Sequence, residues 1–140
     1  MVLVTYWSGT GNTEEMAKIL AKSVEEAGAQ VRLADMEQVS VADVEACDVL
    51  AMGCPSMGNE ELEETVAEPF VASVEGVLNG KKLGLFGSYG WGDGEWMRDW
   101  EERMKKAGAV LVTEEGVICQ EAPDAEAEQK LGELGKVLAG

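Results

Sequence analysis

Short apolar runs alternate along this chain with segments of helical periodicity. The apolar runs cover residues 2–7, 31–33, 49–54 and 82–87, and a last strand falls in two pieces, 110–112 and 117–119. Helices are predicted over residues 13–27, 41–46, 62–78 and 95–107, and Asp124 caps a final helix that ends at Ala139. Strands that alternate with helices favour parallel crossovers. Five of them predict an α/β fold, a three-layer doubly wound five-stranded parallel sheet in the order 2-1-3-4-5.

The length of 140 residues suits one domain, and we expect residues 1–140 to form it around a single core. No apolar run reaches eighteen residues and no charged-then-apolar leader is present, so we expect neither a membrane span nor a signal peptide. Cys47, Cys54 and Cys119 lack zinc-site spacing, and an odd number argues against a disulfide framework. Reduced thiols fit a cytoplasmic protein.

The charge balance excludes several classes of function. Eleven basic and 27 acidic residues give a net charge of −16, which repels nucleic acid and anionic lipid. Such a surface favours basic partners or serves solubility alone, and the sequence leaves both open. The chain has no histidine, which excludes Ser-His-Asp and Cys-His catalysis and removes the commonest metal ligand.

A loop of small polar residues joins the first predicted strand to the first helix. It reads Ser8-Gly9-Thr10-Gly11-Asn12-Thr13 and contains no Lys or Arg. Backbone N–H groups and hydroxyls at a helix N-terminus bind phosphate without a countercharge, which favours a phosphate that stays bound as part of a cofactor. The GxGxxG pattern fails because Glu14 replaces its third glycine, and no Walker pattern is present. A plain helix-capping loop is the alternative.

A second unusual loop follows the apolar run 49–54. Within residues 55–61, Gly58 and Asn59 are residue types that accept positive φ, and Gly58 suits the first central position of a II′ turn. A loop able to flip one peptide would act as a switch. An ordinary tight turn explains the same residues.

The third loop, residues 88–95, places Trp91 between glycines. Core tryptophans normally lie inside regular elements, so Trp91 is a candidate to stack on a flat ligand. Trp96 and Trp100 differ, because their four-residue spacing within a predicted helix indicates packing residues. Because parallel strands end at one edge of the sheet, the three loops are expected to converge there.

The sequence offers few candidate residues for catalysis without a cofactor. The pairs Glu60-Glu61 and Glu63-Glu64 fall in runs typical of a solvated face. A cysteine phosphatase loop needs an Arg six residues after its Cys, where Cys54 has Glu60. A phospho-receiver domain needs an acidic pair after the first strand, where this chain has Ser8 and Gly9.

Taken together, the three loops resemble those of flavodoxins, in particular the short-chain, clostridial-type flavodoxins. The resemblance spans essentially the whole chain and is strongest over residues 6–13, 57–64, 68–70 and 80–96. It implies tightly bound, non-covalent FMN. Two stretches depart from the family pattern: Asn59 stands where an Asp is common, and Gln120-Glu121-Ala122 replaces a Gln-Asn-Glu run on the ribityl side.

The resemblance also implies roles for individual residues. The first loop would hold the phosphate through Ser8, Thr10, Asn12, Thr13 and its amides. Trp91 would stack on the outer face of the flavin ring, and Met57 would cover the inner face. Glu60 would accept the flavin N3–H, and the Gly58 carbonyl would accept N5–H after reduction. The implied cofactor contacts are Ser8, Gly9, Thr10, Gly11, Asn12, Thr13, Pro55, Ser56, Met57, Gly58, Asn59, Glu60, Ser88, Tyr89, Gly90, Trp91 and Gly92.

The implied function is a low-potential one-electron carrier that shuttles between flavin semiquinone and hydroquinone and serves redox enzymes in place of ferredoxin. Acidic residues around the flavin would steer it to basic docking patches on partner proteins, and we expect a monomer. An FMN-dependent reductase or subunit with its own substrate is the alternative, and a fold-only module without FMN is a third.

Overall fold

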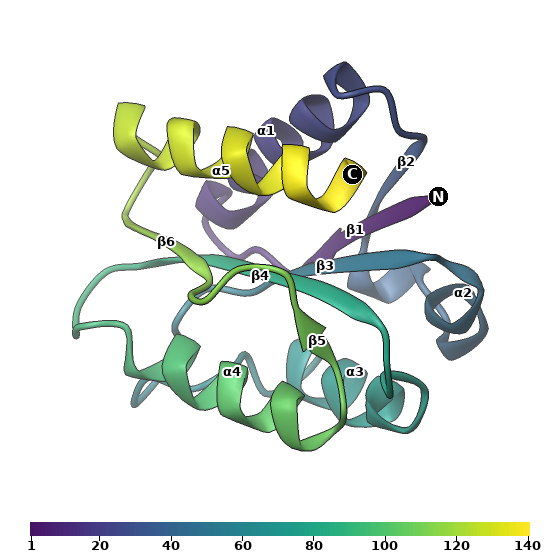
Figure 1. Cartoon of the computed structure of the whole chain (residues 1–140). Coiled ribbons are helices and arrows are strands. Elements are labelled where there is room, and N and C mark those ends of the chain that lie inside the picture. The colour runs from purple at the N-terminus through teal and green to yellow at the C-terminus, as the bar shows by residue number, and fades with distance from the viewer.

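The computed structural model describes residues 1–140 and places every strand in one parallel sheet (Figure 1). Its order is β2-β1-β3-β4-β5, and β6 also pairs with β4. Both β5 and β6 pair with β4, at opposite ends, so they are two pieces of one fifth strand. The predicted doubly wound five-stranded order is therefore confirmed. The strands are β1 (Val2–Tyr6), β2 (Val31–Asp35), β3 (Val49–Gly53), β4 (Lys82–Tyr89), β5 (Val110–Leu111) and β6 (Val117–Gln120).

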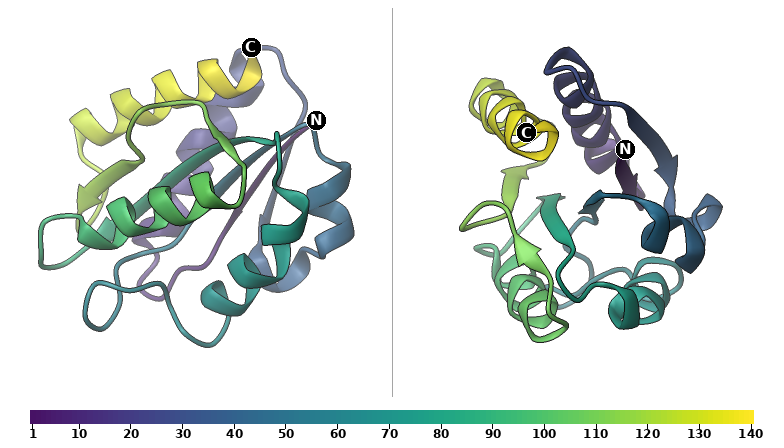
Figure 2. Two further views of the ribbon diagram at one scale, coloured as in Figure 1. Left: turned by 60° about the horizontal axis from the view of Figure 1, so that its bottom comes forward. Right: turned by 45° about the vertical axis from the view of Figure 1, so that its right-hand side comes forward.

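Helices cover both faces of the sheet, and Figure 2 shows the resulting three layers. On one face lie α1 (Asn12–Glu26) and α5 (Ala125–Ala139), and on the other lie α2 (Val41–Ala46), α3 (Ala67–Val74) and α4 (Glu95–Lys106). Short 3-10 turns follow β2 at Met36–Gln38 and α3 at Glu75–Val77. Successive strand residues point to opposite faces. Accordingly Val2 and Val4 join the core beneath α1 and α5, while Leu3 joins the core on the other face.

The two helical tryptophans belong to the core, as their spacing predicts. Trp96 and Trp100 are each 2% exposed, and the Trp96 indole N–H donates to the carbonyl of Cys54 at 3.1 Å. All three cysteines are free and buried, so the expectation of unpaired thiols is confirmed. Burial raises the pKa of the Cys54 thiol to about 12, which keeps it protonated and unreactive at neutral pH.

The helix predicted over residues 62–78 is shorter in the structure. Helix α3 begins at Ala67, and the chain before it forms turns and the short bridge between Met57 and Glu61. Pro69 is therefore the third residue of the helix and not an irregularity in its middle. The amides of the first turn have no acceptor within the helix, so proline is tolerated there.

Glu63 corrects the expectation of a solvated acidic face. Its side chain is buried (5% exposed), and its carboxylate accepts hydrogen bonds from the amides of Thr65 (2.6 Å), Val66 (2.7 Å) and Ala67 (3.0 Å) and from the Thr65 hydroxyl. Burial opposes ionisation of this carboxyl, but the hydrogen bonds outweigh burial and lower its pKa. Glu63 thus supplies a negatively charged cap for α3.

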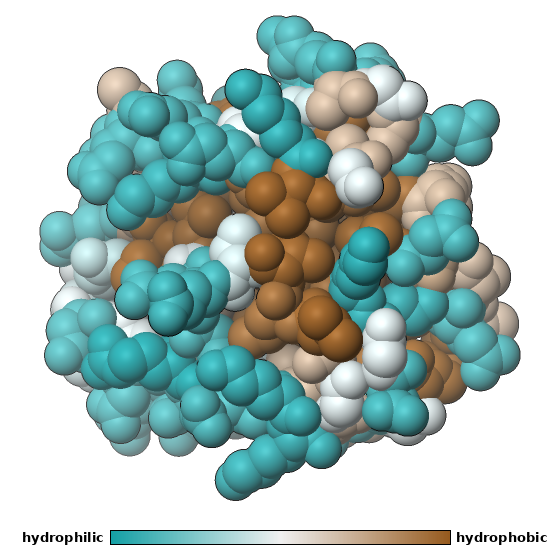
Figure 3. Space-filling model, in the orientation of Figure 1, coloured by the Kyte–Doolittle hydropathy of each residue, from teal (hydrophilic) through white to brown (hydrophobic).

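Apolar surface gathers at the edge of the sheet between α4 and α5, in the middle of the face seen in Figure 3. The exposed side chains there include Val110 of β5 and Val137 of α5. No helix of the chain is both long enough and apolar enough to cross a bilayer.

Replacing Glu63 with Gln should destabilise the fold at neutral pH by about 1–2 kcal/mol, because the uncharged amide offers one acceptor where two oxygens are used. A folded-state pKa below the unfolded value means that the stabilisation is complete above about pH 4.3 and disappears as the carboxyl is protonated at lower pH. Urea unfolding of both chains at pH 7 and near pH 3 measures the difference. Glu64→Gln, at an exposed neighbour, is the control; an equal loss in both variants would contradict the capping role.

Candidate functional site

Hydrogen bonds tie the three unusual loops together at one edge of the sheet. The Trp7 amide donates to the Gly53 carbonyl at 3.0 Å, which joins the ends of β1 and β3. The Ser56 amide donates to the Ser88 carbonyl at 3.0 Å, which joins the second loop to the end of β4. The Ser88 amide donates to the Thr13 hydroxyl at 3.3 Å, closing the set. The predicted convergence is confirmed, and it follows from the parallel order of β1, β3 and β4.

The first loop leaves several amides free. Ser8 Oγ accepts hydrogen bonds from the amides of Gly11 (3.1 Å) and Glu14 (3.2 Å), and Gly11 takes a left-handed conformation with φ +98°. The amides of Thr10, Asn12 and Thr13 have no acceptor within the chain. These three unpaired donors, together with the amides of Ser8 and Gly9, which also have no acceptor, form an anion site of the predicted kind. The capping alternative accounts only for Ser8.

The second loop is a tight hairpin. Met57 and Glu61 exchange two backbone hydrogen bonds of 2.8 Å, and Gly58 between them has φ +53°. The positive φ predicted at Gly58 is confirmed and agrees in sign with a II′ turn. Asn59 does not share it, since the second left-handed residue is Glu60, with φ +54°. Met57 at the start of the hairpin is 39% exposed.

Glu60 bridges the second and third loops. Its Oε1 accepts the amide hydrogen of Glu95, the first residue of α4, at 3.0 Å. The carboxylate also lies against Gly92, where an added Cβ would approach it within 2.5 Å. Its other oxygen, Oε2, has no hydrogen-bond partner in the chain, so Glu60 keeps a free acceptor at this edge.

The third loop starts later than predicted, because β4 continues to Tyr89 and includes Ser88. Tyr89 packs its ring against Trp96 at a centroid distance of 5.6 Å. Trp91, in contrast, is 61% exposed, the largest exposed fraction among the bulky apolar side chains. An exposed tryptophan between glycines at the sheet edge suits stacking on a flat ring.

A fourth segment, Gln120–Glu121, completes the edge beside the third loop. The Glu121 amide donates to the Tyr89 carbonyl (2.8 Å), the Ser88 hydroxyl to the Glu121 carbonyl (2.6 Å), and the Gln120 side chain to the Gly90 carbonyl (3.2 Å). Glu121 has φ +58°, a conformation that Asn adopts more readily. Loop composition alone does not indicate this segment, but the resemblance to flavodoxins implies that residues 120–122 lie on the ribityl side. Its place at the carboxyl end of the fifth strand is the signal that finds it.

Two hollows of the surface do not coincide with these loops. One, of about 400 Å³, is lined by charged residues of α4 and by Glu75. The other, of about 780 Å³, lies between α4 and α5 and touches the third loop only at Asp93 and Gly94. The loops instead form an open edge that combines unpaired amides, an exposed aromatic ring and a free carboxylate oxygen. That set fits a cofactor with a phosphate and a flat ring that carries N–H groups.

Comparison with known proteins identifies the family of the chain. The family model described as flavodoxin matches residues 4–133. The flavodoxin of Clostridium beijerinckii is 49% identical over 136 residues, 97% of each chain, and that of Megasphaera elsdenii is 49% identical over 139 residues, covering 99% of this chain and 98% of the other. The solution structure of the two-electron reduced Megasphaera elsdenii flavodoxin superposes with a TM-score of 0.89 at 48% identity over 99% of this chain and 98% of that one. The chain belongs to the flavodoxin family of FMN-binding electron carriers.

Proposed function

We propose that FMN binds at the open edge formed by the three loops and that the chain passes single electrons between redox proteins without a substrate of its own. The observation that carries this proposal is the meeting, at one edge, of the unpaired amides of Thr10, Asn12 and Thr13 with the exposed ring of Trp91. When bound, FMN supplies the redox chemistry, and the protein sets its orientation and electronics.

The first loop would hold the phosphate. The free amides at the start of α1 offer three donors, and the hydroxyls of Ser8, Thr10 and Thr13 offer three more. Thr13 is 1% exposed and its oxygen already accepts from Ser88, so its O–H is the part left to donate. With no Lys or Arg in the loop, the phosphate would be bound by hydrogen bonds and helix dipole alone.

The second and third loops would enclose the ring. Trp91 and Met57 are the exposed apolar side chains of this edge, and they would cover the two ring faces. Backbone groups of residues 88–90 would contact the ribityl and pyrimidine region. The free oxygen of Glu60 would accept a hydrogen bond from the N3–H, and the carbonyl of Gly58 would accept one from an N–H at N5.

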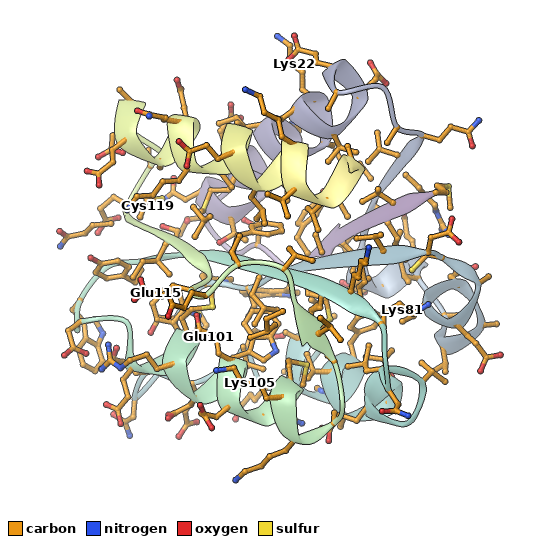
Figure 4. The ribbon with its side chains drawn as sticks, viewed as in Figure 1. Lys22, Lys81, Glu101, Lys105, Glu115 and Cys119 are labelled. Carbon is orange, nitrogen blue, oxygen red and sulfur yellow. The ribbon has the colours of Figure 1, made fainter.

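Charge around this edge would set both the potential and the partners. Residues 55–61 and 88–95 carry Glu60, Glu61, Asp93 and Glu95 and no basic residue. Negative side chains near a reduced cofactor oppose further negative charge and so lower its potential. Lys81 lies toward the opposite end of the molecule (Figure 4), and Arg98 is the one basic side chain hydrogen-bonded to these loops, so acidic groups outnumber basic ones at this edge. We infer docking to basic patches on partner proteins, with the chain as a cytoplasmic monomer.

An FMN-dependent reductase is the second candidate function. It would need residues for hydride or proton handling over the ring, but the chain lacks histidine and the nicotinamide-binding pattern. The hollow of about 780 Å³ between α4 and α5 does not open over the predicted ring contacts. Oxidation of NAD(P)H by the FMN-loaded chain alone would favour the reductase.

Purified protein tests the cofactor and the carrier role together. We expect a yellow chain with stoichiometric FMN that passes through a blue one-electron-reduced form when titrated stepwise with dithionite.

Trp91→Ala should weaken FMN affinity by about tenfold or more, because stacking between large rings is lost. Trp7→Ala removes a tryptophan that, unlike Trp91, is partly buried at this end of the sheet, and it is the comparison variant. Equal FMN affinity in wild type and Trp91→Ala would contradict the assigned ring contact.

Gly58→Thr should reduce the accumulation of one-electron-reduced FMN during the same titration. A β-branched residue resists the positive φ seen at Gly58 and hinders any rotation that presents its carbonyl to N5. One hydrogen bond of about 0.5–1.5 kcal/mol corresponds to tens of millivolts in a one-electron couple. Gly28→Thr imposes comparable strain, φ +97°, at the far end of α1 and is the control. Unchanged accumulation in Gly58→Thr would contradict the switch.

Electron transfer to a basic acceptor should weaken with salt. With cytochrome c as the acceptor, we expect the second-order rate constant to fall about tenfold or more between roughly 0.01 M and 0.3 M ionic strength. Glu61→Lys should slow the reaction at low salt, whereas Glu45→Lys, on α2, should have less effect. Rates that do not depend on salt would count against electrostatic steering.

A further inference from the structure

Arg98 is the one basic residue whose side chain is hydrogen-bonded to any of the three loops. It lies in the first turn of α4, and its guanidinium turns back over the start of the helix. One nitrogen donates to the Asp93 carbonyl at 3.0 Å, and another donates to Asp93 Oδ1 at 3.0 Å. The two bonds close the turn Gly92-Asp93-Gly94, whose glycines have φ +89° and +96°. That turn begins one residue after Trp91.

A cation at this position requires an explanation. The N-terminus of a helix carries a partial positive charge, which disfavours a guanidinium there. Carboxylates compensate: hydrogen bonding to Asp93 and the nearby negative charges of Asp93, Glu60 and Glu95 raise the pKa of Arg98. The position therefore depends on the acidic groups of the second and third loops.

Glu60 connects Arg98 to the proposed ring site. Its carboxylate accepts the Glu95 amide and lies against Gly92, inside the turn that Arg98 closes. Arg98, Asp93 and Glu60 thus form one charged cluster around the base of the segment that carries Trp91. The side chains of Arg98 and Asp93 are 58% and 79% exposed, so the effect of this cluster on overall stability is small.

We propose that Arg98 is a positioning residue for the FMN site. Its forked contact with Asp93 orients the segment that carries Trp91, and its charge offsets the surrounding carboxylates when the cofactor takes up its second electron. That electron comes from a reduced partner protein, and no bond within the chain is made or broken. The inference rests on the proposed placement of FMN at the three loops.

The experiment compares Arg98→Gln, Arg98→Lys and Lys106→Gln with the wild type, all loaded with FMN. Lys106→Gln removes the same charge from the far end of α4 and is the matched control. Redox titration against reference dyes gives the potential of each one-electron couple, and fluorescence titration of the FMN-free chains gives the FMN affinity. Circular dichroism checks that every variant is folded.

Arg98→Gln should make the second reduction less favourable by about threefold to tenfold, which is about 30–60 mV for a one-electron couple, and this shift should shrink at about 1 M salt. Arg98→Lys should keep most of the potential but lose FMN affinity several-fold, because a lysine cannot make the forked contact. Lys106→Gln should match the wild type in both measurements.

Identical second-couple potentials in Arg98→Gln and Lys106→Gln would overturn the charge role. Wild-type FMN affinity in both Arg98 variants would overturn the positioning role. Failure of the proposed function gives a different result. The wild-type chain would then bind no FMN, or the Trp91→Ala variant would bind FMN as tightly as the wild type.

Discussion

The site depends on how closely β3 and β4 approach each other where the core ends. A Cβ at Gly53 would lie 2.1 Å from the Phe86 ring, and a Cβ at Gly87 would lie 2.1 Å from the Cys54 carbonyl oxygen. Only hydrogen fits at both positions. The backbone segments that follow β3 and β4 can therefore remain neighbours beyond the sheet, as the hydrogen bond from the Ser56 amide to the Ser88 carbonyl shows. The second and third loops leave the sheet side by side as a result.

Much of this architecture is predictable from local pattern. Alternating apolar runs and helical segments are enough to predict the strand order, and that order alone brings residues 8–13, 55–61 and 88–95 to one edge. Positive φ at Gly58 and the burial of Trp96 also follow from residue type and spacing.

The features that composition and residue spacing alone do not predict all depend on contacts formed in three dimensions. The sequence pattern around Glu63 is typical of a surface residue, but its carboxylate lies beneath the first turn of α3. The sequence indicates only that Arg98 is a charged residue on a helix, whereas in the structure its side chain turns back to Asp93. Glu121 contacts the third loop only because the fifth strand pairs with β4, more than thirty positions earlier in the sequence. The spacing of residues along the sequence does not predict such contacts.

The broken fifth strand has a consequence for how this acidic protein behaves when crowded. The edge of the sheet at β5 is apolar and uncovered, which is the condition under which chains add to one another strand by strand. Here only Val110 and Leu111 are in strand conformation before the backbone turns away, and pairing resumes at Val117, farther along β4. An incoming strand would find too short a stretch of backbone donors and acceptors to extend. The interruption at residues 112–116 therefore hinders the addition of a further strand at this edge. Electrostatic repulsion between two chains, each with a charge of −16, opposes the same association.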